Sequence, residues 1–143
     1  MIRGGISIFK GRRVLLLQGP LGPFFSRLAF DLTQAGAVVS KIDFNGGDWA
    51  FSPRGSITFR GRASAWPAFF ENVLNERRID MVLLFGDCRS MHREAHEIAA
   101  KRGIELGVFE EGYVRPDYNT LERFGVNGQS KISRDPDFYF HTT

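Results

Sequence analysis

Four short segments of the sequence combine glycine with polar or charged side chains, and each follows a run of apolar residues. They lie at residues 18–20, 45–48, 86–89 and 110–113. Glycine allows the backbone to approach a ligand closely, and amide, carboxylate and guanidinium groups can bind a polar substrate. Any one of these segments alone would be an ordinary turn. Their repetition after four apolar runs indicates a ligand-binding site built from loops.

The first segment, Gln18, Gly19 and Pro20, precedes a stretch with helical periodicity. Free backbone N–H groups at the start of a helix can hold an anion, which would make this segment a binding loop. A rigid turn containing proline is an equally good interpretation. The segment is neither G-x-G-x-x-G nor a Walker loop, so it predicts neither an NAD nor an ATP site.

The second and third segments hold further candidates for substrate binding. Asn45 and Asp48 lie in N-G-G-D, which is also a strong turn signal. Asp87 precedes a predicted helix, and its carboxylate could cap that helix. Alternatively, Asp87 could join Arg89 and His92 in holding a hydroxyl or carboxylate group of a substrate.

Nucleophilic and metal chemistry are weaker interpretations of the same region. Cys88 has a histidine nearby but no other sign of activation. His92 and His96 have the spacing of a metal-binding pair on a helix, but the H-E-x-x-H pattern is absent. A solvent-exposed helix face is the preferred interpretation, and we predict no metal site.

The fourth segment supplies two adjacent carboxylates, Glu110 and Glu111, directly after an apolar run. Side chains alternate along an extended chain, so one is expected to point into the binding crevice and the other away from it. A carboxylate near Arg115 suits acid–base or nucleophilic chemistry. A purely structural Glu–Arg ion pair is the alternative.

The elements that would position these segments follow from hydrophobic periodicity. Apolar runs at residues 14–17, 37–44, 81–85 and 104–109 predict buried strands, with a short extended piece at 56–59. Helical spacing predicts helices over 23–35, 66–77 and 91–101, the first with Pro23 in its first turn and Gly36 after its end. This alternation predicts an α/β fold with a doubly wound, Rossmann-like parallel sheet. Ligands of such sheets bind outside the carboxyl ends of the strands, where all four segments fall.

Two parts of the chain are distinguished by their patterns. Residues 1–114 carry the strand and helix signals and are expected to form one Rossmann-like domain. Residues 115–143 are polar, rich in turn-forming residues and without apolar periodicity, so an irregular segment is expected there. It would lead toward a further domain that this chain does not contain.

Composition excludes several classes of function. The 143 residues are 43% apolar and 24% charged, which is typical of a folded soluble domain. The net charge of +3 suits an anionic partner, but no run of four Lys or Arg residues occurs, and we predict no nucleic-acid binding. One cysteine, no signal peptide and no long apolar stretch predict a cytoplasmic protein.

Several of these motifs together resemble a known family. They are Q-G-P-L-G-P-F-F, F-N-G-G-D, L-F-G-D-C-R-S-M-H, F-E-E-G-Y-V-R-P-D and T-L-E-R-F-G-V-N. In order and spacing they look like the capsular polysaccharide export and biosynthesis proteins of the KpsS/LipB type. The similarity extends from Val14 to Tyr139.

The resemblance implies an activity and a location. Members of this family are retaining β-Kdo glycosyltransferases, which transfer Kdo from CMP-Kdo to a phosphatidylglycerol-type lipid and so build the linker of the capsule. They have a GT-B-like architecture of two Rossmann-like halves and require no cofactor beyond the donor substrate. The implied protein is cytoplasmic and peripheral at the inner membrane, where it would contact the anionic membrane surface and other capsule assembly proteins.

The resemblance also implies roles for individual residues, and it implies which half of the enzyme this chain forms. Glu111 matches a functional carboxylate and is expected to lie nearest the reacting sugar. The expected substrate contacts are Gln18, Gly19, Pro20, Asn45, Asp48, Asp87, Arg89, His92, Glu110 and Arg115. The chain corresponds to the N-terminal, acceptor-side half, and the C-terminal His-Pro segment expected near the nucleotide is absent. The fragment alone is therefore expected to be inactive.

A second hypothesis is a non-enzymatic component of capsule export or assembly that binds anionic lipid or polysaccharide. Its motivation is the basic composition, the 14 phenylalanines and the absence of the donor-binding half. A transfer assay and a lipid-binding assay would separate the two hypotheses.

Overall fold

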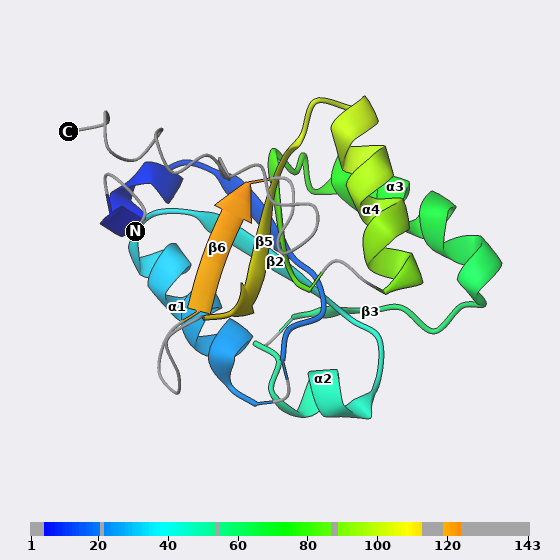
Figure 1. Cartoon of the computed structure of the whole chain (residues 1–143), viewed down its shortest axis with the longest axis horizontal. Helices are drawn as coiled ribbons and strands as arrows, with labels where there is room; N and C mark the ends of the chain where they lie inside the picture. The colour runs from blue at the N-terminus through cyan, green and yellow to red at the C-terminus, as the bar shows by residue number, and fades with distance from the viewer. Residues whose placement is uncertain (1–4, 21, 54, 87–88, 113–118, 124–143) are drawn as a thin grey trace, which may run out of the picture.

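Most of the expected elements are present in the computed structural model, which describes residues 5–20, 22–53, 55–86, 89–112 and 119–123 (Figure 1). The strands are β1 (Arg13–Leu16), β2 (Val38–Asp43), β3 (Ile57–Thr58), β4 (Met81–Phe85), β5 (Glu105–Glu111) and β6 (Asn119–Arg123). The helices are α1 (Phe24–Gln34), α2 (Gly46–Ala50), α3 (Trp66–Glu76) and α4 (Ser90–Lys101). Short 3-10 turns lie at Gly5–Phe9 and Ala63–Ala65.

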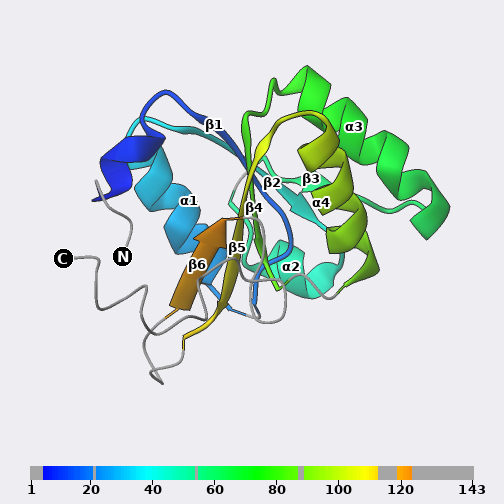
Figure 2. The ribbon, with the colours of Figure 1, turned by 45° about the horizontal axis from the view of Figure 1, so that its top comes forward.

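The described strands form one sheet in the order β3-β2-β1-β4-β5-β6. The first five strands pair in parallel, and β6 runs antiparallel to β5. Helix α1 lies on one face of the sheet, and α3 and α4 lie on the other (Figure 2). The fold is thus α/β and Rossmann-like, as predicted. The strand order reverses between β1 and β4, which is where ligands bind to such sheets.

Strand β1 shows why a continuous apolar run predicts a central strand. Val14 and Leu16 face the core under α1, whereas Leu15 and Leu17, the residue after the strand, face the core under α3 and α4. All four side chains are inaccessible to solvent. Because both faces of the strand are covered, every position must be apolar, and the alternation of a half-exposed strand is lost.

The first helix begins one residue later than the sequence suggested. Pro23 is the N-cap of α1 rather than its first residue, and Gly36 follows the helix with a φ of +93°, a conformation that favours glycine. Phe25, Ala29 and Leu32 bury the apolar face of the helix against the sheet. In the described part of the chain, no helix is both long and apolar enough to cross a bilayer.

Arg12 holds the amino-terminal edge of the sheet together. Its Nε lies 2.6 Å from Asp80 Oδ1, just before β4, and its Nη2 lies 3.0 Å from Glu105 Oε2, at the start of β5. The side-chain hydrogen bond to Asp80 raises the pKa of Arg12, and burial opposes that effect. These contacts align the starts of three adjacent strands, and so fix where their carboxyl ends emerge.

Two local expectations were wrong. The irregular segment expected over residues 115–143 contains β6, whose Leu121 packs against the α1-side core. Its sequence, N-T-L-E-R, holds one apolar residue, which is too few for a periodicity signal. The turn expected at 45–48 is the start of α2, with Asn45 as the N-cap. The proposed division between residues 114 and 115 stays a prediction.

Candidate functional site

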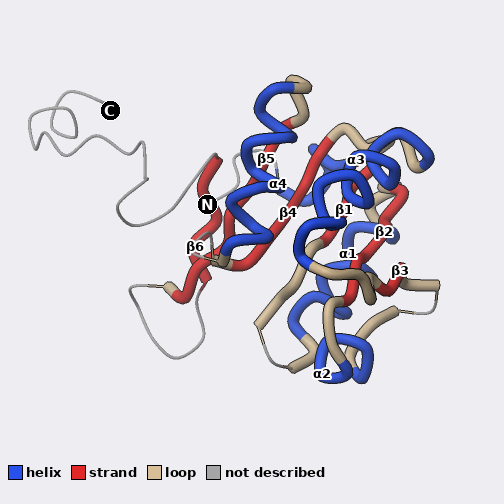
Figure 3. Tube along the Cα trace, turned by 90° about the vertical axis from the view of Figure 1, so that its right-hand side faces the viewer, coloured by secondary structure: helices blue, strands red, loops and turns tan. Residues whose placement is uncertain are grey.

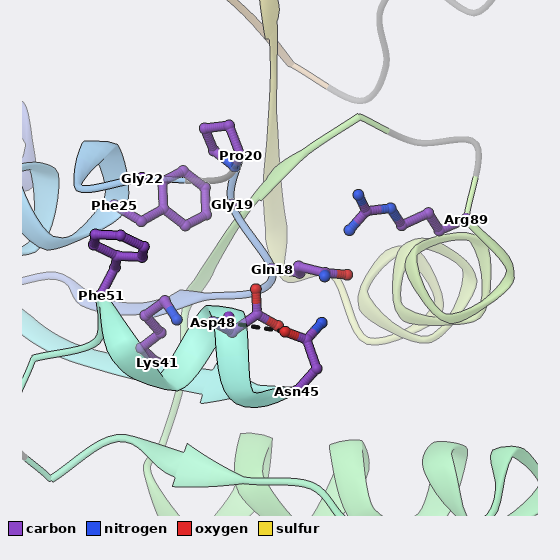
Figure 4. Close-up of a pocket in the computed structure, with 11 residues that line it drawn as sticks. Gln18, Gly19, Pro20, Gly22, Phe25, Lys41, Asn45, Asp48, Phe51 and Arg89 are labelled. Atoms are coloured by element: carbon purple, nitrogen blue, oxygen red, sulfur yellow. Dashed lines mark hydrogen bonds between the residues drawn. The ribbon is translucent and has the colours of Figure 1, made fainter.

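A pocket of about 220 Å³ lies at the carboxyl ends of β1 and β2, on the side of the sheet where the strand order reverses. Three of the four predicted segments contribute to it. Its lining residues are Gln18, Gly19, Pro20, Gly22, Phe25, Lys41, Asn45, Gly47, Asp48, Phe51 and Arg89. In Figure 4, Phe25 and Phe51 lie on one side of the pocket and Arg89 on the other, with Gln18 between them.

The loop after β1 forms the first wall. The Leu17 N–H donates to the Leu83 carbonyl over 2.9 Å, which keeps the chain against β4 as it leaves β1. A Cβ at position 19 would lie 2.8 Å from Phe25 Cγ, closer than carbon atoms pack. Glycine at this position therefore lets the loop lie directly on the Phe25 ring, and the loop presents Gln18 and Pro20 to the pocket.

The start of α2 forms the second wall. Asn45 Oδ1 accepts a hydrogen bond from the Asp48 N–H over 3.0 Å, and Asp48 Oδ2 accepts one from the Phe44 N–H over 3.1 Å. This reciprocal arrangement satisfies N–H groups at the beginning of the helix, as a capping box does. It also fixes the Asn45 and Asp48 side chains at the pocket, so the two residues combine a structural role with a lining position.

A buried ion pair beneath the second wall was not anticipated. Lys41 and Asp43 on β2 form a salt bridge, with side chains only 3% and 0% exposed. Lys41 Nζ also donates to Ser52 Oγ over 2.6 Å, and Ser52 Oγ donates to the Asp48 carbonyl oxygen over 2.8 Å. These hydrogen bonds connect β2 to the end of α2. Lys41 itself reaches the pocket wall.

Arg89 forms the third wall and supplies most of the pocket's available positive charge. It is the N-cap residue of α4 and has an extended backbone. Its exposed side chain extends toward the pocket (Figure 4). The other cation of the lining, Lys41, is already paired with Asp43. A guanidinium group can donate two parallel hydrogen bonds to a carboxylate. The arrangement suits a small polar ligand with an anionic group.

His92 is placed differently from the expectation of a solvent-exposed helix face. Its side chain is 1% exposed, and its Nδ1 lies 2.6 Å from the carbonyl oxygen of Gly86. The ring also lies 6.5 Å from the Phe44 ring. His92 therefore ties α4 to the turn after β4. It is not one of the residues that line the pocket, and a substrate contact stays a prediction.

The two adjacent carboxylates lie at the same edge of the sheet but outside the pocket lining. Glu110 and Glu111 are the last residues of β5, which runs further than expected, and they pair with Thr120 and Asn119 of β6. Glu110 is half-buried and Glu111 is exposed. Asp87, Cys88 and Arg115 lie outside the described residues.

Comparison with known proteins finds relatives of this chain. The chain is 41% identical to the capsule polysaccharide export protein KpsS of Escherichia coli over 92% of its own length and 34% of the relative. It is 43% identical to the capsule polysaccharide modification protein LipB of Neisseria meningitidis, over 91% of its length and 32% of the relative. The chain is a relative of these capsule proteins. The resemblance predicted from the motifs is thereby confirmed.

The matches cover the whole candidate site. The profile of the family described as "Capsule polysaccharide biosynthesis protein" matches residues 80–143, which include Arg89 and β5. A match over more than nine tenths of the chain necessarily includes the segments 18–20 and 45–48 as well. The chain spans about a third of the length of the curated relatives it matches.

Proposed function

We propose that this chain takes part in capsule polysaccharide biosynthesis as the acceptor-side half of a retaining β-Kdo glycosyltransferase. One observation carries the proposal. Three loops meet in a polar pocket at the reversal point of a Rossmann-like sheet, in a chain whose relatives are named for capsule polysaccharide export and modification. The donor in this proposal is CMP-Kdo, and no metal takes part in it.

The chemistry of the pocket walls matches that of a Kdo residue, which carries a carboxylate and several hydroxyl groups. Arg89 would donate two hydrogen bonds to the carboxylate, and the amides of Gln18 and Asn45 would bind hydroxyl groups. The rings of Phe25 and Phe51 would lie against the C–H face of the sugar. The pocket holds about 220 Å³, enough for part of one sugar residue rather than for a whole nucleotide sugar.

The reacting groups would meet above the carboxyl edge of the sheet. Glu111 ends β5 at that edge, and we propose that its carboxylate lies nearest the reacting sugar. The nucleotide of CMP-Kdo would bind to a second Rossmann-like half, so the pocket forms one wall of the complete active site. The acceptor would be a phosphatidylglycerol-type lipid, reached from the cytoplasmic face of the inner membrane.

A second candidate is a non-enzymatic assembly component that binds anionic lipid. It is favoured by the net charge of +3 and by exposed aromatic side chains such as Phe30 and Trp49. Exposed aromatic and basic residues are typical of surfaces that contact membranes. This candidate needs no second half and no turnover of CMP-Kdo.

A transfer assay on the longest natural reading frame separates the two candidates. We expect CMP to be released from CMP-Kdo in amounts that depend on the lipid acceptor, and no release by residues 1–143 alone. Phosphatidylglycerol vesicles provide the parallel measurement. Vesicle binding that disappears at high salt, together with no CMP release by the full-length protein, would reject the glycosyltransferase and support the lipid-binding component.

A further inference from the structure

Lys41 is a buried cation at the wall of the pocket. Its side chain is only 3% exposed, yet it is one of the residues that line the pocket. In Figure 4 the side chain lies beside Phe51, with its amino group on the side of Asp48. Lysine is almost never fully buried unless it is paired. The partners that hold Lys41 in place therefore decide what it can offer a ligand.

The hydrogen bonds of Lys41 leave one donor unused. An ammonium group has three N–H donors. One donates to Asp43 and another to Ser52 Oγ over 2.6 Å, and no other described residue accepts the third. Because Asp43 balances the charge, Lys41 offers the pocket a directed N–H rather than a net positive charge. Such a donor suits a neutral oxygen atom, such as that of a sugar hydroxyl group.

Folding alone does not account for a lysine at this position. Asp43 is fully buried, and its Oδ2 has no hydrogen-bond partner among the described residues. Replacing a buried ion pair by apolar side chains of similar volume is often neutral or stabilising. A pair that also leaves a carboxylate oxygen and an ammonium N–H unsatisfied gives the fold still less. The position of Lys41 at the pocket supplies a reason that stability does not.

Asp48 supplies an acceptor at the same wall. Its Oδ2 accepts from the Phe44 N–H over 3.1 Å, which fixes the carboxylate at the start of α2. Its Oδ1 makes no hydrogen bond to a described residue. Helix α2 lies at the carboxyl edge of the sheet, at the foot of Figure 3, and Ser52 connects the Asp48 carbonyl to Lys41. The unused donor and the unused acceptor are thus held by one network.

We propose that Lys41 and Asp48 form a hydroxyl-binding site within the pocket. A hydroxyl group both donates and accepts, so Lys41 Nζ donates to the oxygen of one sugar hydroxyl, and that hydroxyl donates to Asp48 Oδ1. The inference rests on the proposed function, because the hydroxyl belongs to the sugar whose carboxylate Arg89 binds. It adds a specificity determinant. Arg89 selects for an acid, whereas Lys41 and Asp48 select for a hydroxyl group at one position of that acid.

Calorimetry of the full-length natural protein tests this site, with free Kdo and a set of analogues that each lack one hydroxyl group. We expect one analogue to bind about 10–100-fold more weakly than Kdo, because its binding leaves charged groups without their partner. The other analogues should lose no more than about tenfold, since the amides of Gln18 and Asn45 make neutral hydrogen bonds. The ratio of the affinities for Kdo and for the weakest analogue measures the site.

Variants assign that ratio to the two residues. Lys41→Met with Asp43→Leu removes the donor without leaving a buried charge unpaired, and should bring the ratio close to one. Asp48→Asn keeps the size of the side chain and an oxygen for the Phe44 N–H, and should also lower the ratio. Arg89→Met is the control, because it should weaken binding of Kdo and of the analogue by the same factor and leave the ratio unchanged.

The outcomes separate this inference from the proposed function. Equal affinities for Kdo and every analogue in the wild type, with binding dependent on Arg89, would overturn the hydroxyl site and leave the pocket in place. A ratio that persists in the Lys41 double variant, or in Asp48→Asn where the double variant does not fold, would overturn the site as well. A uniform loss for all the sugars would reduce Lys41 to a structural support. No binding of Kdo would overturn both proposals.

Discussion

Replacing Glu111 with Gln in the full-length natural protein should lower the rate of Kdo transfer by about 10²–10⁴-fold, the usual contribution of a positioned acid or base. Glutamine keeps the size of the side chain but can neither accept a proton nor offer a negative charge to the developing oxocarbenium ion. Glu111 is exposed at the end of β5, and urea denaturation of both proteins checks that the variant is folded under the assay conditions.

The control for this variant is Glu97→Gln, which neutralises an exposed carboxylate on α4. Initial rates of CMP release at saturating lipid acceptor measure both variants. A Glu111→Gln protein that transfers Kdo at the wild-type rate would remove Glu111 from the chemistry, and the search for the catalytic carboxylate would move elsewhere on the sheet edge.

Replacing Lys41 with Met should lower the free energy of unfolding by about 3–5 kcal/mol, the range measured when one partner of a buried ion pair is removed. The cause is Asp43, whose side chain is fully buried and would keep its charge without its partner. The link through Ser52 to the Asp48 carbonyl would be lost as well, and with it the support of the second wall. Urea denaturation of residues 1–143, or of the full-length protein where the fragment is insoluble, measures the change.

A double variant separates the loss of the pair from the loss of packing. Lys41→Met with Asp43→Leu removes both charges, and should recover much of the stability that the single change loses. Lys101→Met, at the exposed end of α4, should change stability by no more than about 0.5 kcal/mol. A single variant at Lys41 that matches this surface control would show that the pair does not support the wall.

The parts of the fold that hydrophobicity specifies could be predicted from the sequence. The runs that became β1 and β4 are apolar at nearly every position because helices cover both faces of the sheet. Strand β6 could not be predicted in this way, since its pairing with β5 depends on backbone hydrogen bonds and on Leu121 alone among apolar side chains. Helix α2 could not be predicted either, because Asn and Gly favour both turns and helix starts.

The candidate site could be predicted only in part, for a reason of topology. The sequence places the four polar segments at one edge of the sheet, but it does not give the strand order. Because β1 lies between β2 and β4, the segment after β1 meets Asn45 on one side and Arg89 on the other. Glu111 ends β5, one strand further along, and lies outside this pocket lining.

Lys41 shows what a pattern of residue types cannot convey. In V-V-S-K-I-D, a lysine two residues before an aspartate would normally mark the exposed face of an edge strand. Here β3 pairs with the last two residues of β2, Ser52 bonds to Lys41 from the end of α2, and the two charges are buried against each other. The only available signal was their spacing, which places both side chains on the same face of the strand.

The central claim, that the pocket binds an acidic sugar, is tested most directly by the affinity of the full-length natural protein for Kdo with Arg89 intact and replaced. Arg89→Met should weaken binding by about 10–100-fold, since a hydrogen-bonded charge contributes about 1.5–3 kcal/mol. Arg93→Met, one turn further along α4 and outside the pocket lining, should leave the affinity unchanged. Equal calorimetric affinities for the wild type and the Arg89 variant would contradict the account.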